Sequence, residues 1–589
     1  MKKILDLIAD QMKAAFAQCG YDEAYAKVVL SNRPDLCEYQ CNGAMAAAKA
    51  YKKKPIDIAN EAVEKLAGNE MFSGINAVMP GFINLRLDPQ YLADYMNGMQ
   101  REAKLGVEET GHGETVIVDY GGANVAKPLH VGHLRSAVIG ESIKRMGAFL
   151  GYHMIGDVHL GDWGLQMGLI IEELRDRKPE LVYFDESYTG EYPAEAPFTI
   201  GELEDIYPTA SGKAKEDEAF KERAQEATFK LQNGYAPFTA IWKHIMAVSL
   251  ADLKKNYANL DVHFELWKGE SDAQPYIPWL IQDLQDKGLA YESQGALVVD
   301  IAEPTDSKEL PPCIVRKSDG AALYATSDLG TIIEREKDFA PVKYIYITDK
   351  RQELHFTQVF RVAKKAGYVK QDTPMIHIGF GTMNGKDGKP FKTRDGGVMR
   401  LENLIADIDA AVFDRIMENR TVSEDEARET AKIVGLAALK YGDLSNQAAK
   451  DYVFDLDRFI SFEGNTGPYI LYTMVRIKSI LAKYEALKEK FTGEAVILPA
   501  ASEAEKALML GLGRYNEVME TSFAETAPHK ICQYIFELSN AFNSFYHDTK
   551  ILAEEDKERQ ASWIKLITLV KDVLKACIQV LGFDAPERM

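Results

Sequence analysis

The chain has 589 residues, of which 46% are hydrophobic and 27% charged, and its formal net charge is −20. This length predicts several domains, and the composition is typical of a soluble globular protein. No run of about 18 apolar residues occurs, so we predict no membrane-spanning helix and no membrane partner. The acidic balance alone disfavours a nucleic-acid partner, because Lys and Arg supply most of the affinity for phosphates.

Residues 1–105 are predicted to form a small α/β domain. Helical patterns and then alternating strand patterns follow one another, with helices over 3–19, 35–51 and 56–66 and strands over 75–79 and 82–87. The start of the chain mixes acidic and apolar residues and is typical of an amphipathic helix, not of a signal peptide. The six cysteines form no paired framework, which favours a reducing cytoplasm.

A strand, a loop and a helix follow in residues 115–150. Thr115–Val118 is β-branched and continuous, as in a buried strand, and 134–150 carries apolar residues at helical spacing. In an α/β sheet such a junction binds ligands, and free N–H groups at the helix start suit phosphate. His130 and His133 are three residues apart and can face one side of the helix entry, while Gly132 permits close approach of a nucleotide. Lys127 adds a cation.

The segment Pro128-Leu-His-Val-Gly-His133 is a form of the His-x-Gly-His signature of class I aminoacyl-tRNA synthetases. The longer string from Asn124 to Ser136 resembles arginyl-tRNA synthetases in particular. The resemblance implies that L-arginine is activated with ATP to arginyl-adenylate and transferred to the terminal ribose of tRNA(Arg), releasing AMP and diphosphate. It implies ATP with Mg²⁺ as a substrate, no tightly bound prosthetic group and no DNA partner, and we expect a monomer.

The same resemblance implies roles for the residues of the loop and the helix start. ATP is expected along His130, Gly132 and His133, with Lys127 nearby, and these two histidines and Lys127 are candidate catalytic residues that stabilise phosphoryl charge. Asp119 and Asn124 are placed on the amino acid. The carboxylate of Asp119 can pair with the guanidinium or with the α-ammonium, and the sequence does not choose between them.

Residues of about 171–295 have charged, helical patterns and are predicted to be an insertion between the two halves of the nucleotide-binding fold, with loops at 190–197 and 207–212. Before the insertion, His159 and Asp162 lie in a segment similar to the family's Gly-Asp-Trp-Gly loop and are candidate substrate contacts. After it, Tyr324 and Asp328 match the family's Tyr-x-Thr-x-Asp segment. There the two side chains meet the guanidinium of the substrate, which suits its need for a carboxylate and an aromatic wall.

Two further family matches complete the expected active site. Gln352 matches a contact of the amino acid, and His355 is expected near the nucleotide. The loop 384–397 follows a predicted strand at 377–383 and stands where class I enzymes usually have Lys-Met-Ser-Lys-Ser. This chain has Pro390-Phe-Lys-Thr-Arg394 instead, so Lys127, Lys389, Lys392 and Arg394 all stay open as the residue that replaces the usual lysine. We predict no dedicated metal site.

The chain is helical from about residue 431 onwards, and Glu463–Tyr469 and the chain end resemble the anticodon-binding bundle of the family. We therefore expect an α/β multidomain protein with an N-terminal α/β domain (1–105) that contacts tRNA, a Rossmann-like catalytic domain (106–430) and a C-terminal helical bundle (431–589). Two alternatives stay open: a class I synthetase for another amino acid, lysine above all, and a tRNA-binding relative without catalysis.

Overall fold

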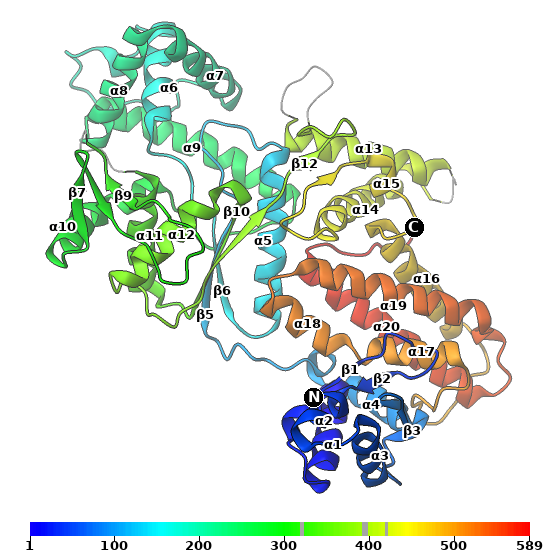
Figure 1. The fold of residues 1–589 in the computed structure, drawn as a ribbon. Coiled ribbons are helices and arrows are strands. Elements are labelled where there is room, and N and C mark those ends of the chain that lie inside the picture. The colour runs from blue at the N-terminus through cyan, green and yellow to red at the C-terminus, as the bar shows by residue number, and fades with distance from the viewer. Residues whose placement is uncertain (319–322, 392–398, 419–421) are drawn as a thin grey trace. The chain divides into compact units, whose positions relative to one another are not determined.

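The computed structural model describes residues 1–318, 323–391, 399–418 and 422–589. The chain divides into two compact units, one of residues 1–109, 462–579 and 584–589 and the other of residues 110–461 and 580–583 (Figure 1). No helix in these described ranges is long and apolar enough to cross a membrane.

The first unit begins with the predicted small α/β domain. Its antiparallel sheet has the strand order β1-β2-β4-β3. The elements are α1 Ile4–Gln18, β1 Val28–Leu30, β2 Tyr39–Cys41, α2 Gly43–Tyr51, α3 Pro55–Lys65, β3 Phe72–Val78, β4 Phe82–Leu87 and α4 Pro89–Arg101. The helix predicted over 35–51 is wrong in its first half, because residues 39–41 form a strand. Tyr39 and Cys41 are buried, and Gln40 between them bonds Asn84 across the sheet at 2.9 Å, so pairing with β4 outweighs local helix propensity.

The helical bundle predicted for the C-terminal region forms the rest of the first unit. It consists of α16 Gly467–Glu485, α17 Glu503–Leu512, α18 Tyr515–Ala524, α19 Pro528–Asp548 and α20 Lys557–Leu581, whose last residues belong to the second unit. Helix α19 packs against α16, α17 and α18, and its inner face is apolar, with Ile531, Ile535 and Phe542 buried.

The second unit is built on a parallel sheet with the strand order β11-β10-β5-β6. Strand β5 (Thr115–Asp119) lies inside the sheet between β10 (Lys343–Asp349) and β6 (His153–Asp157), and β11 (Met375–Phe380) is an edge strand. Central strands are buried on both faces, which explains the unbroken apolar run from Val116 to Val118. Helix α5 (Val131–Phe149) follows β5, as predicted.

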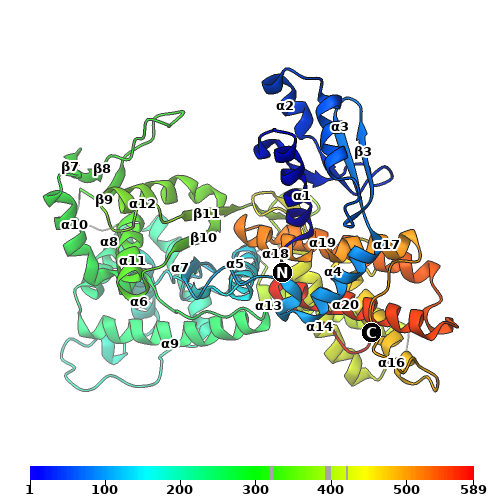
Figure 2. The same ribbon diagram turned by 90° about the horizontal axis from the view of Figure 1, so that it is seen from below.

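Much of the predicted insertion is a cluster of four helices that pack on one another and end at residue 259 (Figures 1 and 2). They are α6 Leu165–Arg177, α7 Ile200–Glu216, α8 Glu218–Gln232 and α9 Ala236–Asn259. The loop predicted at 207–212 is wrong, because these residues lie inside α7. A capping box of Thr199 and Glu202 starts this helix, and the buried residues Leu203, Ile206 and Ala210 form its inner face, which outweighs the helix-breaking tendency of Pro208.

The rest of the second unit surrounds the sheet. Its elements are α10 Ile277–Asp286, β7 Ala290–Ser293, β8 Ala296–Val299, β9 Cys313–Arg316, α11 Tyr324–Phe339, α12 Glu353–Lys365, β12 Met383–Asn384, α13 Leu401–Glu418, α14 Glu424–Leu444, β13 Tyr452–Val453 and α15 Leu456–Phe459. Buried residues of α10, α11, α12 and the strands β8 to β10 form one apolar core. This core fixes α11 against the strand ends at which the site lies.

Candidate active site

Two aspartates end neighbouring strands, Asp119 on β5 and Asp157 on β6, and they face each other in register. Arg335 of α11 reaches both, with Nη2 2.6 Å from Asp119 and 2.7 Å from Asp157, and its Nη1 lies 3.1 Å from the hydroxyl of Tyr346. All three charged side chains are almost fully buried. Burial raises the pKa of Asp119, whereas at Asp157 the nearby Arg335 and His159 outweigh burial and lower the pKa. An arginine of the chain itself therefore neutralises part of this acidic cluster.

Asp328 lies one helical turn into α11 and is bound by two histidines. His159 Nε2 lies 3.3 Å from one carboxylate oxygen and His355 Nε2 lies 2.5 Å from the other. Although burial favours the neutral imidazole, the hydrogen bond to Asp328 and the charge of Asp119 raise the pKa of His159 to about 9. The same two histidines outweigh burial and hold the pKa of Asp328 well below its usual range. The structure thus joins Asp328, His159 and His355 in one network.

His159 has an unusual backbone conformation. It follows β6 with φ at +44°, a left-handed backbone conformation that residues other than glycine rarely adopt. Its Nδ1 is buried, and no described residue bonds to it. Such strain costs roughly 1–3 kcal/mol and persists where the surroundings hold it, often in functional sites.

The aromatic residue expected beside Asp328 lies at the start of the same helix. Tyr324 is the first residue of α11, one turn before Asp328, and 69% of its surface is exposed. Gln352 is also exposed, at the end of a 3-10 turn, Lys350–Gln352, that follows β10. Both side chains are open to a ligand.

Glu270 is a residue of this site that the sequence analysis missed. Burial raises its pKa to about 7, and the nearby His159 lowers it and the nearby Asp328 raises it. Burial and the charge of Glu270 in turn raise the pKa of Tyr324. It begins the 3-10 turn Glu270–Tyr276, far in sequence from the motifs. The stretch from Gly269 to Asp272 has the pattern of an ordinary turn, so no sequence signal marked it.

The loops that carry Asn124 and Asp162 touch each other. Val125 N–H donates to Gly161 O at 3.2 Å, and Gly161 N–H donates to Ala123 O at 3.0 Å. A Cβ on Gly161 would lie 2.0 Å from Oδ1 of Asn124, so only glycine fits against this side chain. Asp162 is fully buried, and its carboxylate accepts bonds from the Ser271 hydroxyl at 2.6 Å and N–H at 3.0 Å. Asp162 therefore holds the loop rather than facing a ligand.

The two signature histidines cap the start of α5. Gly132 N–H donates to His130 Nδ1 at 3.0 Å, and His130 N–H donates to His133 Nδ1 at 3.2 Å. Their ring centroids are 4.0 Å apart. Burial and the neighbouring cations lower the pKa of both, that of His133 to about 3, so both rings are neutral near pH 7. Because each Nδ1 accepts, each neutral ring carries its proton on Nε2 and can donate from there.

The residues that follow the second signature loop are attached beside these histidines. Val131 N–H donates to Met399 O at 3.1 Å, and Leu401 N–H donates to Leu129 O at 2.9 Å. Lys389 lies exposed in the turn before the loop's central part. Lys392 and Arg394 lie outside the described residues. The ammonium of Lys127 lies 4.4 Å from the ring centroid of Tyr207 in the insertion, a cation–π contact.

Three family profiles match the chain in order. They are the arginyl-tRNA synthetase N-terminal domain over residues 2–87, the catalytic domain of class I tRNA synthetases (R) over 96–456 and the DALR anticodon-binding domain over 470–589. Among curated proteins, the chain is 61% identical over 597 residues to an arginine–tRNA ligase of Agathobacter rectalis and 56% identical over 589 residues to one of Alkaliphilus oremlandii. Both alignments cover all of each chain.

Solved structures agree at the level of the fold. The arginyl-tRNA synthetases of Plasmodium falciparum and Thermus thermophilus superpose over the whole of both chains with TM-scores of 0.82 and 0.80, at 24% and 21% identity. The expected architecture of a small α/β domain, a parallel-sheet catalytic domain and a helical bundle is therefore confirmed. The chain belongs to the arginyl-tRNA synthetase family of class I aminoacyl-tRNA synthetases, and it is an arginine–tRNA ligase.

Proposed function

We propose that the acidic site around Asp328 binds the arginine side chain and that the capped start of α5 binds ATP in the ligase reaction. The observation that carries this proposal is the convergence of Asp328, Glu270 and Tyr324 beside strand ends that also lead to His130 and His133. A planar guanidinium needs carboxylate acceptors and an aromatic surface. Two carboxylates and an exposed tyrosine meet that need.

The other end of the amino acid lies towards the strand ends. We assign Asn124, His159 and Gln352 to its α-amino and carboxylate groups. Asp119 is assigned to the same end because Arg335 already bonds one of its oxygens, which leaves the other for the α-ammonium. His355 bonds Asp328 directly, so we assign it to the arginine pocket instead of the nucleotide.

The nucleotide is assigned to the start of α5. His130 and His133 each offer an Nε2–H donor, and the first N–H groups of the helix add positive potential. Gly132 keeps this surface open, since a Cβ there would lie 2.7 Å from the His130 ring. Lys127, Lys389, Lys392 and Arg394 remain the candidates for the cation beside the pyrophosphate.

The reaction then needs positioning and electrostatic stabilisation, and no covalent enzyme intermediate. The carboxylate of arginine attacks the α-phosphate, and pyrophosphate leaves as the neutral imidazole donors stabilise charge on the phosphoryl oxygens. The terminal ribose hydroxyl of tRNA(Arg) next attacks the arginyl carbonyl, and AMP leaves. No group of three or more metal-ligating side chains occurs in the described part of the chain, so we propose that Mg²⁺ arrives with ATP.

The remaining assignments follow the domains expected from the sequence. We propose that residues 1–105 contact tRNA, that 106–430 catalyse and that 431–589 bind the anticodon. We also propose a monomer that works in the cytoplasm, and six unpaired cysteines, five of them buried, support a reducing compartment.

Charging of total tRNA with labelled arginine, and with labelled lysine in parallel, tests the proposal. We expect charging with arginine alone, because lysine's compact ammonium lacks the planar fork of donors that pairs with carboxylates and stacks on an aromatic ring. Charging with lysine would contradict the pocket assignment. If the protein charges tRNA with neither amino acid but still binds tRNA, the alternative of a tRNA-binding relative without catalytic activity would be favoured.

A further inference from the structure

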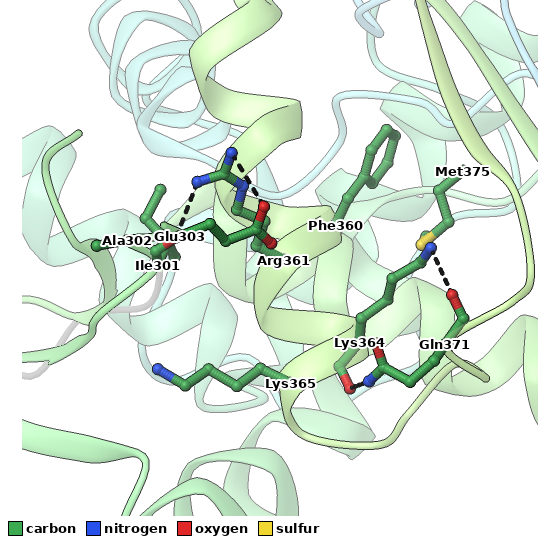
Figure 3. Close-up of a pocket in the computed structure, with 9 residues that line it drawn as sticks. All are labelled: Ile301, Ala302, Glu303, Phe360, Arg361, Lys364, Lys365, Gln371 and Met375. Atoms are coloured by element: carbon green, nitrogen blue, oxygen red, sulfur yellow. Dashed lines mark hydrogen bonds and ion pairs between the residues drawn. The ribbon is translucent and has the colours of Figure 1, made fainter. Parts of the chain in front are cut away.

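A hollow of about 580 Å³ opens beside α12, towards the edge strand β11 of the catalytic sheet. Helix α12, the segment after β8 and the residues that lead into β11 form its walls (Figure 3). Its volume is that of a small-molecule site. The arginine pocket and the start of α5 are made by other residues, so the proposed reaction does not use this hollow.

Arg361 fixes one wall of the hollow. Its guanidinium bonds both carboxylate oxygens of Asp306, at 2.7 and 2.8 Å, and the carbonyl of Ile301 at 2.9 Å. The guanidinium also lies 3.5 Å from the carboxylate of Glu303, which lines the hollow. Acidic side chains therefore already match the arginine charge, and the role of Arg361 is to hold the 301–306 segment against α12.

Two lysines of the same helix bond backbone carbonyls instead of carboxylates. Lys364 Nζ donates to the carbonyl of Gln371 at 3.0 Å, and Lys365 Nζ donates to the carbonyl of Asp300 at 2.8 Å. No carboxylate among the residues that the structure describes pairs with either ammonium. Each ammonium has three donors and uses one, so two remain for a ligand. In a chain of net charge −20, two lysines without acidic partners beside one hollow mark a local anion site.

The hollow also has an aromatic wall. Phe360 is half-buried, and its ring lies 5.2 Å from that of Tyr346 and 5.7 Å from that of Phe356, measured between centroids. These contacts hold the ring in place where it lines the hollow, as a surface on which a flat base can stack.

A second hollow of about 520 Å³ adjoins the first, because Phe360 and Met375 line both. It extends to Gly379, near the carboxyl end of β11, the end of the sheet where the active site lies. Together the hollows exceed the size of one nucleotide. Lys364 and Lys365 also leave the helix in different directions (Figure 3), so one phosphate cannot bridge them, whereas two phosphates of a strand can meet one lysine each.

We propose that this groove, made of the two hollows, binds a strand of the tRNA substrate. Lys364 and Lys365 contact successive phosphates, and Phe360 stacks on a base. The inference rests on the proposed function in one respect, that tRNA is the substrate, and it adds a site on the catalytic unit that the active-site assignment does not include.

The test compares two double variants of the full chain, Lys364→Gln/Lys365→Gln and the control Lys254→Gln/Lys255→Gln, which removes two exposed lysines of α9. Dissociation constants for tRNA are measured at several salt concentrations. For the groove variant we expect roughly tenfold weaker binding at low salt and a log–log salt slope smaller by about two, one for each lost phosphate contact. The control variant is expected to match wild type, and arginine affinity measured by calorimetry should be unchanged in both.

Equal tRNA affinity and salt slope in the groove variant and wild type, with wild type still charging tRNA, would overturn the inference alone. Failure of wild type to charge or bind tRNA would instead reject the proposed function. Binding of AMP, measured by equilibrium dialysis, distinguishes another ligand. If the groove variant loses AMP binding but keeps its tRNA affinity, the groove is a small-nucleotide site and the proposal is wrong. In the same way, a crosslinker on Lys365→Cys should label tRNA and one on Lys254→Cys should not.

Discussion

The guanidinium of Arg335 lies 2.6 Å from the carboxylate of Asp119, and both side chains are buried. The protein thus places an arginine of its own beside the carboxylate for which the guanidinium or the α-ammonium of the substrate was the expected partner. Asp157 shares this arginine at 2.7 Å, so a single guanidinium compensates two carboxylates at the strand ends. This relationship gives Arg335 a structural role in the site, and Asp328 is the aspartate that we propose for the substrate side chain.

The first prediction concerns this buried cluster. Arg335→Met leaves two carboxylates without a cation and should lower the free energy of unfolding by about 3–5 kcal/mol. Arg351→Met is the control, because the Arg351 side chain is 84% exposed and its ion pair is a surface pair with Asp349. Such surface pairs are worth about 0–1 kcal/mol. Urea denaturation followed by circular dichroism measures both. Equal losses in the two variants would contradict the structural role of Arg335.

The second prediction tests Asp328 as the acceptor of the guanidinium. Asp328→Asn removes the charge and keeps the size, and we expect arginine affinity to fall by about 2–5 kcal/mol, that is at least about thirtyfold. Asp338→Asn, an exposed change on the same helix, should leave it unchanged. Calorimetric titration with arginine gives both values. An Asp328→Asn variant that binds arginine as wild type does would remove Asp328 from the pocket.

The third prediction is a pH dependence of stability. The folded pKa of His159 is raised to about 9 from an ordinary value of 6.5, so the folded state binds the proton more tightly than the unfolded state does. Its stabilisation is complete below about pH 6.5 and is lost as the pH rises to about 9, by on the order of 3 kcal/mol in total. The stability difference between wild type and His159→Gln should therefore shrink over that interval.

Chemical denaturation at pH 6, 7.5 and 9 measures this difference. His153→Gln provides a control, since His153 is an exposed residue at the start of the same strand. A difference between wild type and His159→Gln that stays constant with pH would mean that His159 does not bind a proton over this range.

The fourth prediction concerns the neutral histidines at the start of α5. His133→Ala removes an Nε2–H donor, and we expect adenylate formation to slow by about 10²–10³-fold while arginine affinity stays unchanged. Because the pKa of His133 is about 3, its protonation should add no limb to the pH–rate profile above about pH 5. Burst measurement of adenylate, with exposed His112→Ala as control, checks the rate. Unchanged adenylate formation would exclude His133 from phosphoryl stabilisation.

The sequence by itself determined the elements whose signals are local. The β-branched run at 115–118 and the helical spacing of apolar residues after residue 134 predicted β5 and α5, because strands and helices repeat their apolar residues with different periods. Tyr324 and Asp328 were expected on one face if a helix begins near Thr326, and the helix α11 begins two residues earlier, at Tyr324. The chemistry expected in the active site came from family motifs, and each motif is a short continuous stretch of the chain.

Only the tertiary structure decided which distant groups meet. Arg335 and Asp119 are separated by 216 residues, and nothing near either one indicates the other. Glu270 lies in an ordinary turn, and its raised pKa comes from burial among side chains of other elements. Residues 39–41 form a strand because β4 lies beside them. Pairing and burial depend on neighbours that only the folded chain supplies, so a local sequence pattern cannot contain them.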